Sequence, residues 1–529
     1  MHSAVVVEEG RNPLPQSSPP AIPYREISED GEIIPLSSSN EQGGAKPSST
    51  DPTQRLVSLD VFRGLTVALM ILVDDAGGAF PSINHSPWFG VTLADFVMPF
   101  FLVSVGFSIG LVFKVCLQFS FLDTIWNLDI KLRGNKLKRK GKIRHCTTQN
   151  ANRKKSNKCI ATKKVILRTM KLFLLGLVLQ GGYFHGRNHL TYGVDVDRIR
   201  WLGVLQRISI GYFLAAISEI WLVIDIIVDS VVAFVNKYYM QWLVAILLCS
   251  LYMGLLYGLY VPSWDFEAQS MNSTLSMPIY GSGSQIVNCG VRGSLEPPCN
   301  AVGMVDRILL GEKHLYQHPV YRRTKECSVN SPDYGPLPSN SPVWCLAPFD
   351  PEGILSSLMA SVTCFVGLHY AHIVVHCKSH KRRIFLWSMF SLPLLVSGFV
   401  MKELGIPFSK QLYTLSYMCI TSGASGILLS VIYYIVDVNH FRKPTILLQW
   451  MGMNALIVYV LAACELFPAA IQGFYWRSPE KNLVNGTEAL MQTIFRSKKW
   501  GTLAFVLLEI LFWCLVAGYL RMKGIYVKL

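Results

Sequence analysis

Long apolar segments constrain this 529-residue chain more than any other feature, because about 20 apolar residues in a helix cross a bilayer core. Backbone polar groups in hydrocarbon must find partners within their own segment, so we expect helices. We predict an all-α polytopic integral membrane protein with about ten transmembrane helices and one long disulfide-containing luminal loop. The predicted spans are 56–78, 92–114, 165–184, 201–224, 240–262, 353–376, 384–401, 411–436, 444–467 and 501–521.

Basic residues at the span ends predict the orientation, because Lys and Arg in short flanks stay on the cytosolic side. With both chain termini in the cytosol, every basic flank falls on that side. These flanks are Arg55, 131–171, Lys237, 378–383, 442–443 and 521–528. The loops 79–91, 185–200, 263–352, 402–410 and 468–500 then face the lumen.

The net charge of +15 comes from one segment. Sixteen Lys and Arg residues lie between Lys131 and Lys171 without an acid, and 33 basic residues remain elsewhere against 34 acidic ones. We therefore predict no nucleic-acid partner. The basic cytosolic loop 115–163 either binds anionic lipid headgroups or is an insertion of gene-model or splicing origin. Residues 1–54, rich in Pro, Ser and Gly, are predicted to be a disordered cytosolic tail before the membrane domain 55–529.

Four cysteines gather in the predicted luminal loop 263–352. They are Cys289, Cys299, Cys327 and Cys345. An even number in an oxidising compartment predicts two disulfides, whose pairing the sequence leaves open. Sequons at Asn272 and Asn485 fall on the same side and predict a glycoprotein.

The first two spans carry ionisable side chains at their luminal ends. Asp74 and Asp75 end the first helix, His85 lies in the short connection, and Asp95 begins the second helix. A short loop brings these groups together, and a carboxylate bonded to one imidazole nitrogen raises the basicity of the other. The pattern predicts a general base, with a solvated loop histidine as the alternative.

Further polar residues in or near the spans are candidates for binding. Asp60 and Arg63, three residues apart, are predicted to pair. Polar side chains inside spans contact either a ligand or a neighbouring helix, and both interpretations stay open. His314 and His318 have helical spacing, but Pro319 follows and no HExxH motif is present, so we predict no metal site. The candidate substrate contacts are Asp75, Trp88, Gln206, Arg207, His314, His318 and Asn454.

Several blocks of this sequence resemble the heparan-alpha-glucosaminide N-acetyltransferase family of transmembrane acyltransferases. They are RLVSLDVFRG (55–64), HSPWFGVTLADFVMPFF (85–101), GVLQRISIG (203–211), VDRILLGEKHLYQHP (305–319), FDPEGIL (349–355), LSY (415–417) and GMNALIVY (452–459). The resemblance implies transfer of an acetyl group from cytosolic acetyl-CoA to the amine of a terminal glucosamine in the lysosomal lumen. It also implies that His85, the histidine of the HxxW motif, is the active-site residue, as base or as acetyl carrier, with Asp74 and Asp95 beside it.

The resemblance further implies acetyl-CoA as co-substrate, no metal, and a channel that admits the donor from the cytosol. The nucleotide phosphates would need basic side chains at cytosolic helix ends, for which Arg63, Lys164, Arg168 and Arg442 are candidates. The expected partners are membrane lipid and a luminal amino-sugar glycan, and homodimerisation stays open. The expected location is a lysosomal, vacuolar or other endomembrane, with the plasma membrane as the alternative.

The sequence departs from the family pattern at three places. Asp74 and Phe89 stand where the family has asparagines, so the acceptor contacts are expected to differ. The family's amino-terminal luminal region has no counterpart here, and the loop 115–160 is longer than the family pattern.

Two other classes of function compete with acyl transfer. A proton-coupled or solute transporter would use buried Asp, Arg and His residues, and would be expected to show inverted repeats. A catalytically silent scaffold would tolerate loss of His85. The sequence holds no P-loop, dinucleotide-binding glycine motif, CxxC pair or GxSxG motif, which disfavours ATP-driven and nicotinamide chemistry.

Overall fold

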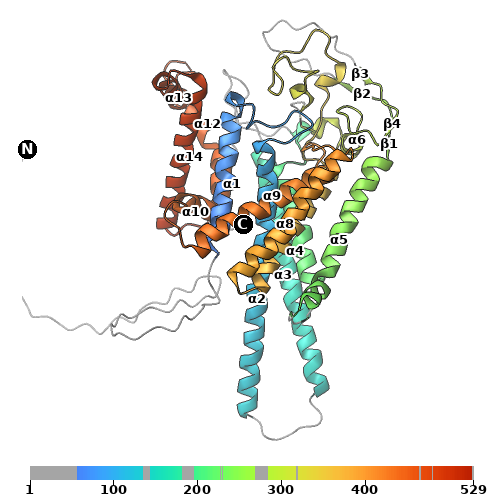
Figure 1. Cartoon of the computed structure of the whole chain (residues 1–529), viewed down its shortest axis with the longest axis vertical. Coiled ribbons are helices and arrows are strands. Elements are labelled where there is room, and N and C mark those ends of the chain that lie inside the picture. The colour runs from blue at the N-terminus through green and yellow to red at the C-terminus, as the bar shows by residue number, and fades with distance from the viewer. Residues whose placement is uncertain are drawn as a thin grey trace, which may run out of the picture. The chain divides into compact units, whose positions relative to one another are not determined.

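A computed structural model describes residues 56–134, 143–180, 196–224, 226, 228, 230–267, 284–316, 320–463, 466–478 and 480–526 (Figure 1). For residues 114–134 and 143–157 only the backbone is described. The predicted tail 1–54, the sequon at Asn272 and the candidate His318 lie outside the described residues.

Long helices dominate the described chain. They are α1 (Val57–Ala76), α2 (Leu93–Gly134), α3 (Ile143–Leu179), α4 (Val204–Trp221), α5 (Val231–Gly258), α7 (Ile354–His376), α8 (His380–Glu403), α9 (Leu415–Tyr433) and α14 (Lys498–Met522). The shorter helices are α6 (Ala301–Leu310), α10 (Ile446–Met453), α11 (Ala455–Val458), α12 (Leu466–Gln472) and α13 (Leu483–Ile494). In the region expected as the basic loop 115–163, the backbone continues as α2 and α3.

Each predicted span overlaps a helix, with α10 and α11 together occupying the ninth. Among the described residues, six helices are long and apolar enough to cross a membrane by length and composition: α2, α5, α7, α8, α9 with its π-helical end, and α14. The predicted α-helical, multi-pass membrane fold is therefore confirmed, whereas the count of ten spans is not. The segments α1, α3, α4 and α10–α11 are helical but carry more charge or are shorter.

Small residues allow the central helices to approach closely. A Cβ on Gly106 of α2 would lie 2.0 Å from the Cys364 carbonyl oxygen of α7, and one on Gly367 would lie 2.3 Å from the Val103 oxygen. Only glycine avoids these clashes, so α2 and α7 pack backbone to backbone.

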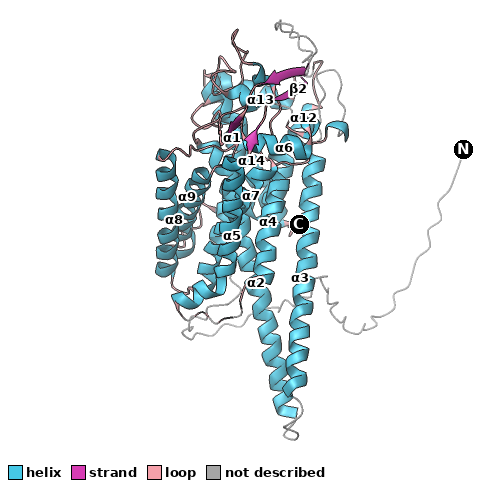
Figure 2. Cartoon of the chain, turned by 90° about the vertical axis from the view of Figure 1, so that its right-hand side faces the viewer, coloured by secondary structure: helices cyan, strands magenta, loops and turns pink. Residues whose placement is uncertain are grey.

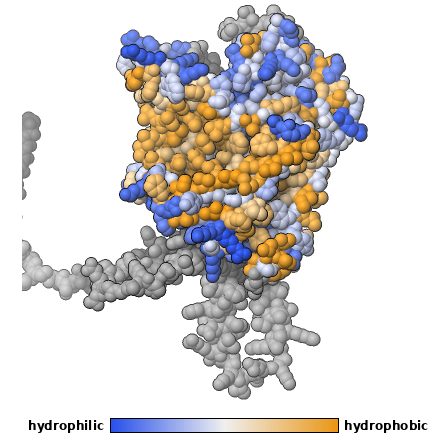
Figure 3. Space-filling model, viewed as in Figure 1, coloured by the Kyte–Doolittle hydropathy of each residue, from blue (hydrophilic) through white to orange (hydrophobic). Residues whose placement is uncertain are grey.

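An apolar band crosses the face of the bundle that Figure 3 shows. Figure 3 shows hydrophobic residues spread across the middle of the molecule, with hydrophilic residues above and below. On α8, Phe385, Met389, Val396 and Phe399 are all exposed. An apolar surface of this extent on a soluble protein would be anomalous, but it suits contact with lipid.

Strands, short helices and loops gather at one end of the bundle (Figure 2). The two antiparallel pairs are β1 (Tyr260–Val261) with β4 (Val291–Arg292), and β2 (Trp264–Glu267) with β3 (Ser284–Val287). Two disulfides, Cys289–Cys299 and Cys327–Cys345, confirm the predicted number and supply the pairing that the sequence left open.

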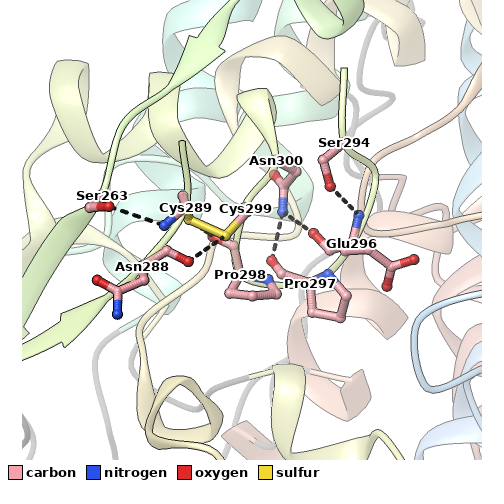
Figure 4. Close-up of a disulfide and its surroundings, with 9 residues drawn as sticks. All are labelled: Ser263, Asn288, Cys289, Ser294, Glu296, Pro297, Pro298, Cys299 and Asn300. Atoms are coloured by element: carbon pink, nitrogen blue, oxygen red, sulfur yellow. Dashed lines mark hydrogen bonds between the residues drawn. A yellow bond between two sulfur atoms is a disulfide. The ribbon is translucent and has the colours of Figure 1, made fainter. Parts of the chain in front are cut away.

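The first disulfide joins the segment between β3 and β4 to the residues just before α6 (Figure 4). Next to Cys299, the Asn300 side chain donates to the carbonyl oxygens of Pro297 at 2.7 Å and Glu296 at 3.2 Å. Its Oδ1 accepts from the Gly303 backbone N–H at 2.8 Å and so caps α6. The disulfide and the Asn300 side chain together fix this part of the segment 263–352 over the helix ends. The described residues of this segment, which was predicted to be luminal, are called the cap below.

Candidate active site

His85 lies in the connection between α1 and α2, at the end of the bundle that carries the cap. Its Nδ1 is 3.0 Å from Oδ1 of Asp95, in the first turn of α2. The second oxygen of Asp95 accepts the backbone N–H groups of Thr92 at 3.0 Å and Ser86 at 3.2 Å. The carboxylate is thus fixed in place as in a capping box, and it orients the ring.

The backbone of His85 is held by its neighbour. Oδ1 of Asn84 accepts the His85 N–H at 2.8 Å and also a hydrogen bond from the guanidinium of Arg323. The Asn84 amide donates to Asp333. Because Arg323 and Asp333 belong to the 263–352 segment, the cap itself positions the histidine.

Lys410 lies against the imidazole. Its Nζ is 3.0 Å from Nδ1 and 3.2 Å from Nε2 of His85. The adjacent Gln411 donates to the carbonyl oxygens of Ser86 and Pro87 at 3.3 and 3.4 Å. The sequence analysis missed this lysine, which is 325 residues away. A usable signal was its place in a predicted luminal loop, where basic residues are uncommon.

The pKa of His85 is lowered from 6.5 to about 4. Burial is the largest cause, followed by the charge of Lys410 and, more weakly, Arg323, while Asp95 opposes the shift. The His85 side chain keeps 27% of its surface exposed. The site therefore holds a neutral, accessible imidazole above about pH 5, which is the form that accepts a proton or attacks a carbonyl.

The two other predicted acids lie around this pair. Asp74 and Asp75 are exposed at the end of α1. Asp74 acts electrostatically on Lys410, and Asp75 shares a hydrogen bond with Glu509 of α14. The structure thus brings Asp95 into contact with the imidazole, whereas Asp75 joins two helices.

Trp88 forms an aromatic cluster beside the site. Its ring centroid is 5.2 Å from that of Phe349 and 5.3 Å from that of Tyr321, and Nε1 donates to the Leu295 carbonyl at 3.0 Å. The indole is buried, with all of these partners in the cap. Trp88 therefore anchors the His85 loop to the cap, and its predicted substrate contact stays a prediction.

Gln206 and Arg207 are buried near the start of α4. The Arg207 guanidinium donates to the Pro351 carbonyl at 2.6 Å and to the hydroxyls of Ser356 and Ser357 at the start of α7. This environment indicates a link between two helices. Gln206 packs against Gly176 and Gly203.

Arg200 forms a further charged group that the sequence analysis missed. Its guanidinium contacts the carboxylates of Asp350 and Glu352, with Nε 2.9 Å from Asp350 Oδ2. Asp350 and Glu352 lie in the FDPEGIL block, so its two acidic residues were the sequence feature that could have indicated a basic partner. Close by, His314 Nδ1 is 2.8 Å from the Ile199 carbonyl oxygen. His314 thus supports the Arg200 segment, and its predicted substrate contact is untested.

A cavity of about 460 Å³ lies between α1, α2, α3, α4 and α11. Its wall is mostly apolar but includes Arg63, Lys164 and Arg168, three of the four residues predicted to bind the donor's phosphates. Arg63 also contacts Asp60, with 3.4 Å between Nη1 and Oδ1, as expected from their spacing. Arg442 is not among the lining residues.

On α2, the residues that line the cavity begin short of the His85 site. Phe101 of α2 lines the cavity, six residues beyond Asp95 and so about 9 Å along the helix axis. Beside Ala455, another lining residue, Asn454 is buried with neither side-chain polar atom hydrogen-bonded within the described structure. A buried amide in this state is a natural ligand contact. Within the described ranges, no group of three or more His, Cys, Asp or Glu residues could hold a metal ion.

Comparison with known proteins found two curated relatives, both named heparan-alpha-glucosaminide N-acetyltransferase. The mouse protein (Mus musculus) is 27% identical over 482 residues, which cover 87% of this chain and 60% of the relative. The human protein (Homo sapiens) is 26% identical over 472 residues, covering 86% and 58%. The chain is thus related to the heparan-alpha-glucosaminide N-acetyltransferases. No family model matches it.

The chain spans about three fifths of the length of these N-acetyltransferases. The similarity covers most of the chain, and the HxxW block that carries the resemblance to the N-acetyltransferases has a definite geometry here. Its histidine meets Asp95 and Lys410, and its tryptophan is inserted into the cap. Phe89, where the family has asparagine, is partly exposed beside the site.

Proposed function

We propose that this chain is a transmembrane acetyltransferase. It transfers the acetyl group of cytosolic acetyl-CoA to the amine of a luminal glucosamine-like sugar, with His85 as base or acetyl carrier. The observation that carries the proposal is the His85–Asp95 pair at one end of α2, with a basic-rimmed apolar cavity along the same helix. The two N-acetyltransferase relatives support the class of reaction.

The cavity suits the shape and chemistry of the donor. Apolar walls fit an extended pantetheine arm, and Arg63, Lys164 and Arg168 offer charge to phosphates. Ser104 and Ser108 of α2 add polar groups along the wall. The thioester would then lie toward Asp95, where the neutral imidazole accepts the amine proton or attacks the acetyl carbon.

The test is acetyl transfer by the purified full chain in detergent, with labelled acetyl-CoA and glucosamine. We expect His85→Ala to lower the rate by at least about 1000-fold, because both mechanisms need the ring. His380→Ala, at the start of α8 with its ring bonded to the Tyr433 hydroxyl, is the matched control and should keep most activity. Equal rates for wild type and His85→Ala would exclude His85 as base or carrier.

A proton-coupled transporter is the second candidate function. It is favoured by His372 of α7, whose Nε2 is 3.0 Å from Oε2 of Glu219 inside the bundle. Such buried pairs carry protons in transporters. Failure of the wild type to acetylate any amine, combined with pH-driven uptake of amino sugars into proteoliposomes, would favour this alternative.

A further inference from the structure

Lys410 is held beside His85 by the segment that follows α8. The Gly90 N–H donates to the Phe408 carbonyl at 2.8 Å, and Gln411 bonds the backbone of the His85 loop. Lys410 is therefore fastened on both sides to the loop that carries the imidazole. Its position follows from these backbone-directed bonds.

The two distances from Nζ define how the ammonium meets the ring. Nζ is nearly equidistant from Nδ1 and Nε2, at 3.0 and 3.2 Å. A donor aligned with the lone pair of one nitrogen would be much closer to that nitrogen than to the other. Because Asp95 already occupies the Nδ1 side, the ammonium acts as a positive charge next to the ring, and Nε2 is the nitrogen that lies away from the carboxylate.

We propose that Lys410 is a catalytic residue whose ammonium stabilises the oxyanion formed at the thioester carbonyl, an inference that rests on the proposed function. In direct transfer, the amine lone pair adds to the acetyl carbon, the carbonyl π electrons move to oxygen, and Nε2 takes the amine proton. Collapse restores the carbonyl and breaks the C–S bond. The thiolate leaves and takes the proton from the imidazolium, so an amide and free CoA thiol result.

The distances suit this role. Lys410 Nζ is 3.2 Å from His85 Nε2. The acetyl carbon would be bonded to Nε2 or lie next to it, so the acetyl oxygen would lie within a few ångströms of Nζ. A preorganised cation at that position in a site shielded from water has a large effect on the barrier. The same reasoning holds if His85 carries the acetyl group, because that route also passes through an oxyanion.

Charged groups from several elements face Lys410. Burial lowers the pKa of Lys410, the carboxylates of Asp95, Glu352 and Asp74 oppose this shift, and Arg323 adds to it weakly. The imidazole of His85 is faced by Asp95, Lys410 and Arg323. The three carboxylates around Lys410 oppose the effect of burial, and the pKa of Lys410 is on balance lowered.

The experiment compares Lys410→Met with wild type at saturating donor and acceptor. We expect kcat to fall about 100-fold or more, as for loss of an oxyanion donor, with the KM for acetyl-CoA changed less than about 3-fold. Lys410→Arg keeps the positive charge, so its kcat should be at least about tenfold higher than that of Lys410→Met. Lys402→Met, at an exposed lysine of the preceding helix end, is the matched control.

A chemical rescue separates the lost charge from a folding defect. Lys410→Cys should be inactive and should regain activity after aminoethylation with 2-bromoethylamine, which rebuilds an ammonium at nearly the same reach. Wild type treated identically controls for the native cysteines. Recovery in the same purified sample shows that the chain was folded.

Three results would overturn the inference. One is a kcat for Lys410→Met within about 3-fold of wild type, and another is absence of rescue in a folded Lys410→Cys sample. The third is acetyl-lysine at position 410 in turnover samples, found by mass spectrometry, because the amine would then be an acceptor. A wild type that acetylates no amine overturns the proposed function as well, which distinguishes the two failures.

Discussion

Two imidazole–carboxylate pairs in this molecule can be compared directly. His85 Nδ1 is 3.0 Å from Asp95, and His372 Nε2 is 3.0 Å from Glu219. The His85 side chain is 27% exposed and has Lys410 beside it. The His372 side chain is only 3% exposed, and Tyr238 stacks on its ring with centroids 3.8 Å apart.

An imidazole–carboxylate pair alone therefore does not define a reactive site. Both carboxylates orient an imidazole, but the His85 side chain is far more exposed and has the Lys410 ammonium within 3.2 Å of both ring nitrogens. At the other pair, Gln241 donates to the same Glu219 oxygen at 2.7 Å, so polar groups on α4, α5 and α7 satisfy one another. Solvent access and a nearby positive charge therefore distinguish a reactive imidazole–carboxylate pair from one that only links helices.

The largest effect is expected when each acid is changed to its amide. Asp95→Asn should lower kcat about 1000-fold, because an amide supports the wrong tautomer and no longer stabilises an imidazolium. Glu219→Gln, the matched change at the other pair, should alter kcat less than about 3-fold. Acetyl-transfer kinetics of both purified variants test the comparison, and equal losses would contradict it.

The second effect concerns stability. His372→Leu leaves Glu219 buried without its imidazole partner and should destabilise the fold by about 3 kcal/mol. The double change Glu219→Leu with His372→Leu should recover most of this loss, because neither charge then remains buried. Thermal unfolding in detergent measures both, and a double variant less stable than the single one would contradict the structural interpretation of the pair.

The third effect concerns the cavity, which is proposed to bind the donor of the His85 site. Reversing the charge at Lys164 and Arg168 with glutamate should raise the KM for acetyl-CoA about tenfold and change kcat little, because phosphate contacts bind donor and transition state alike. Lys163→Glu, at an exposed neighbour outside the cavity wall, is the control. Equal KM values in both variants would remove these residues from the donor site.

Local patterns in the sequence account for much of this molecule. Apolar segments predicted the helices, four cysteines in one loop predicted the two disulfides, and Asp95 was expected near His85 because only a short loop separates them. Lys410 could not be found in this way, since its contact with His85 depends on how the cap closes over distant helix ends. Cys289–Cys299 and Cys327–Cys345 were likewise one pairing among alternatives of equal sequence support.

The smallest effect concerns pH and sharpens the comparison at His85 alone. With a pKa of about 4, the ring should be about half neutral at pH 4, so its reactivity should fall only about twofold between pH 7 and pH 4. A histidine of ordinary pKa would lose about 240-fold over this range, since the protonated form neither attacks nor accepts a proton. The rate of carbethoxylation of His85 by diethyl pyrocarbonate, followed by peptide mass spectrometry, measures this without an acceptor. Because Lys410 lowers the pKa, Lys410→Met should move the midpoint upward, and an unchanged midpoint would show that burial alone sets it.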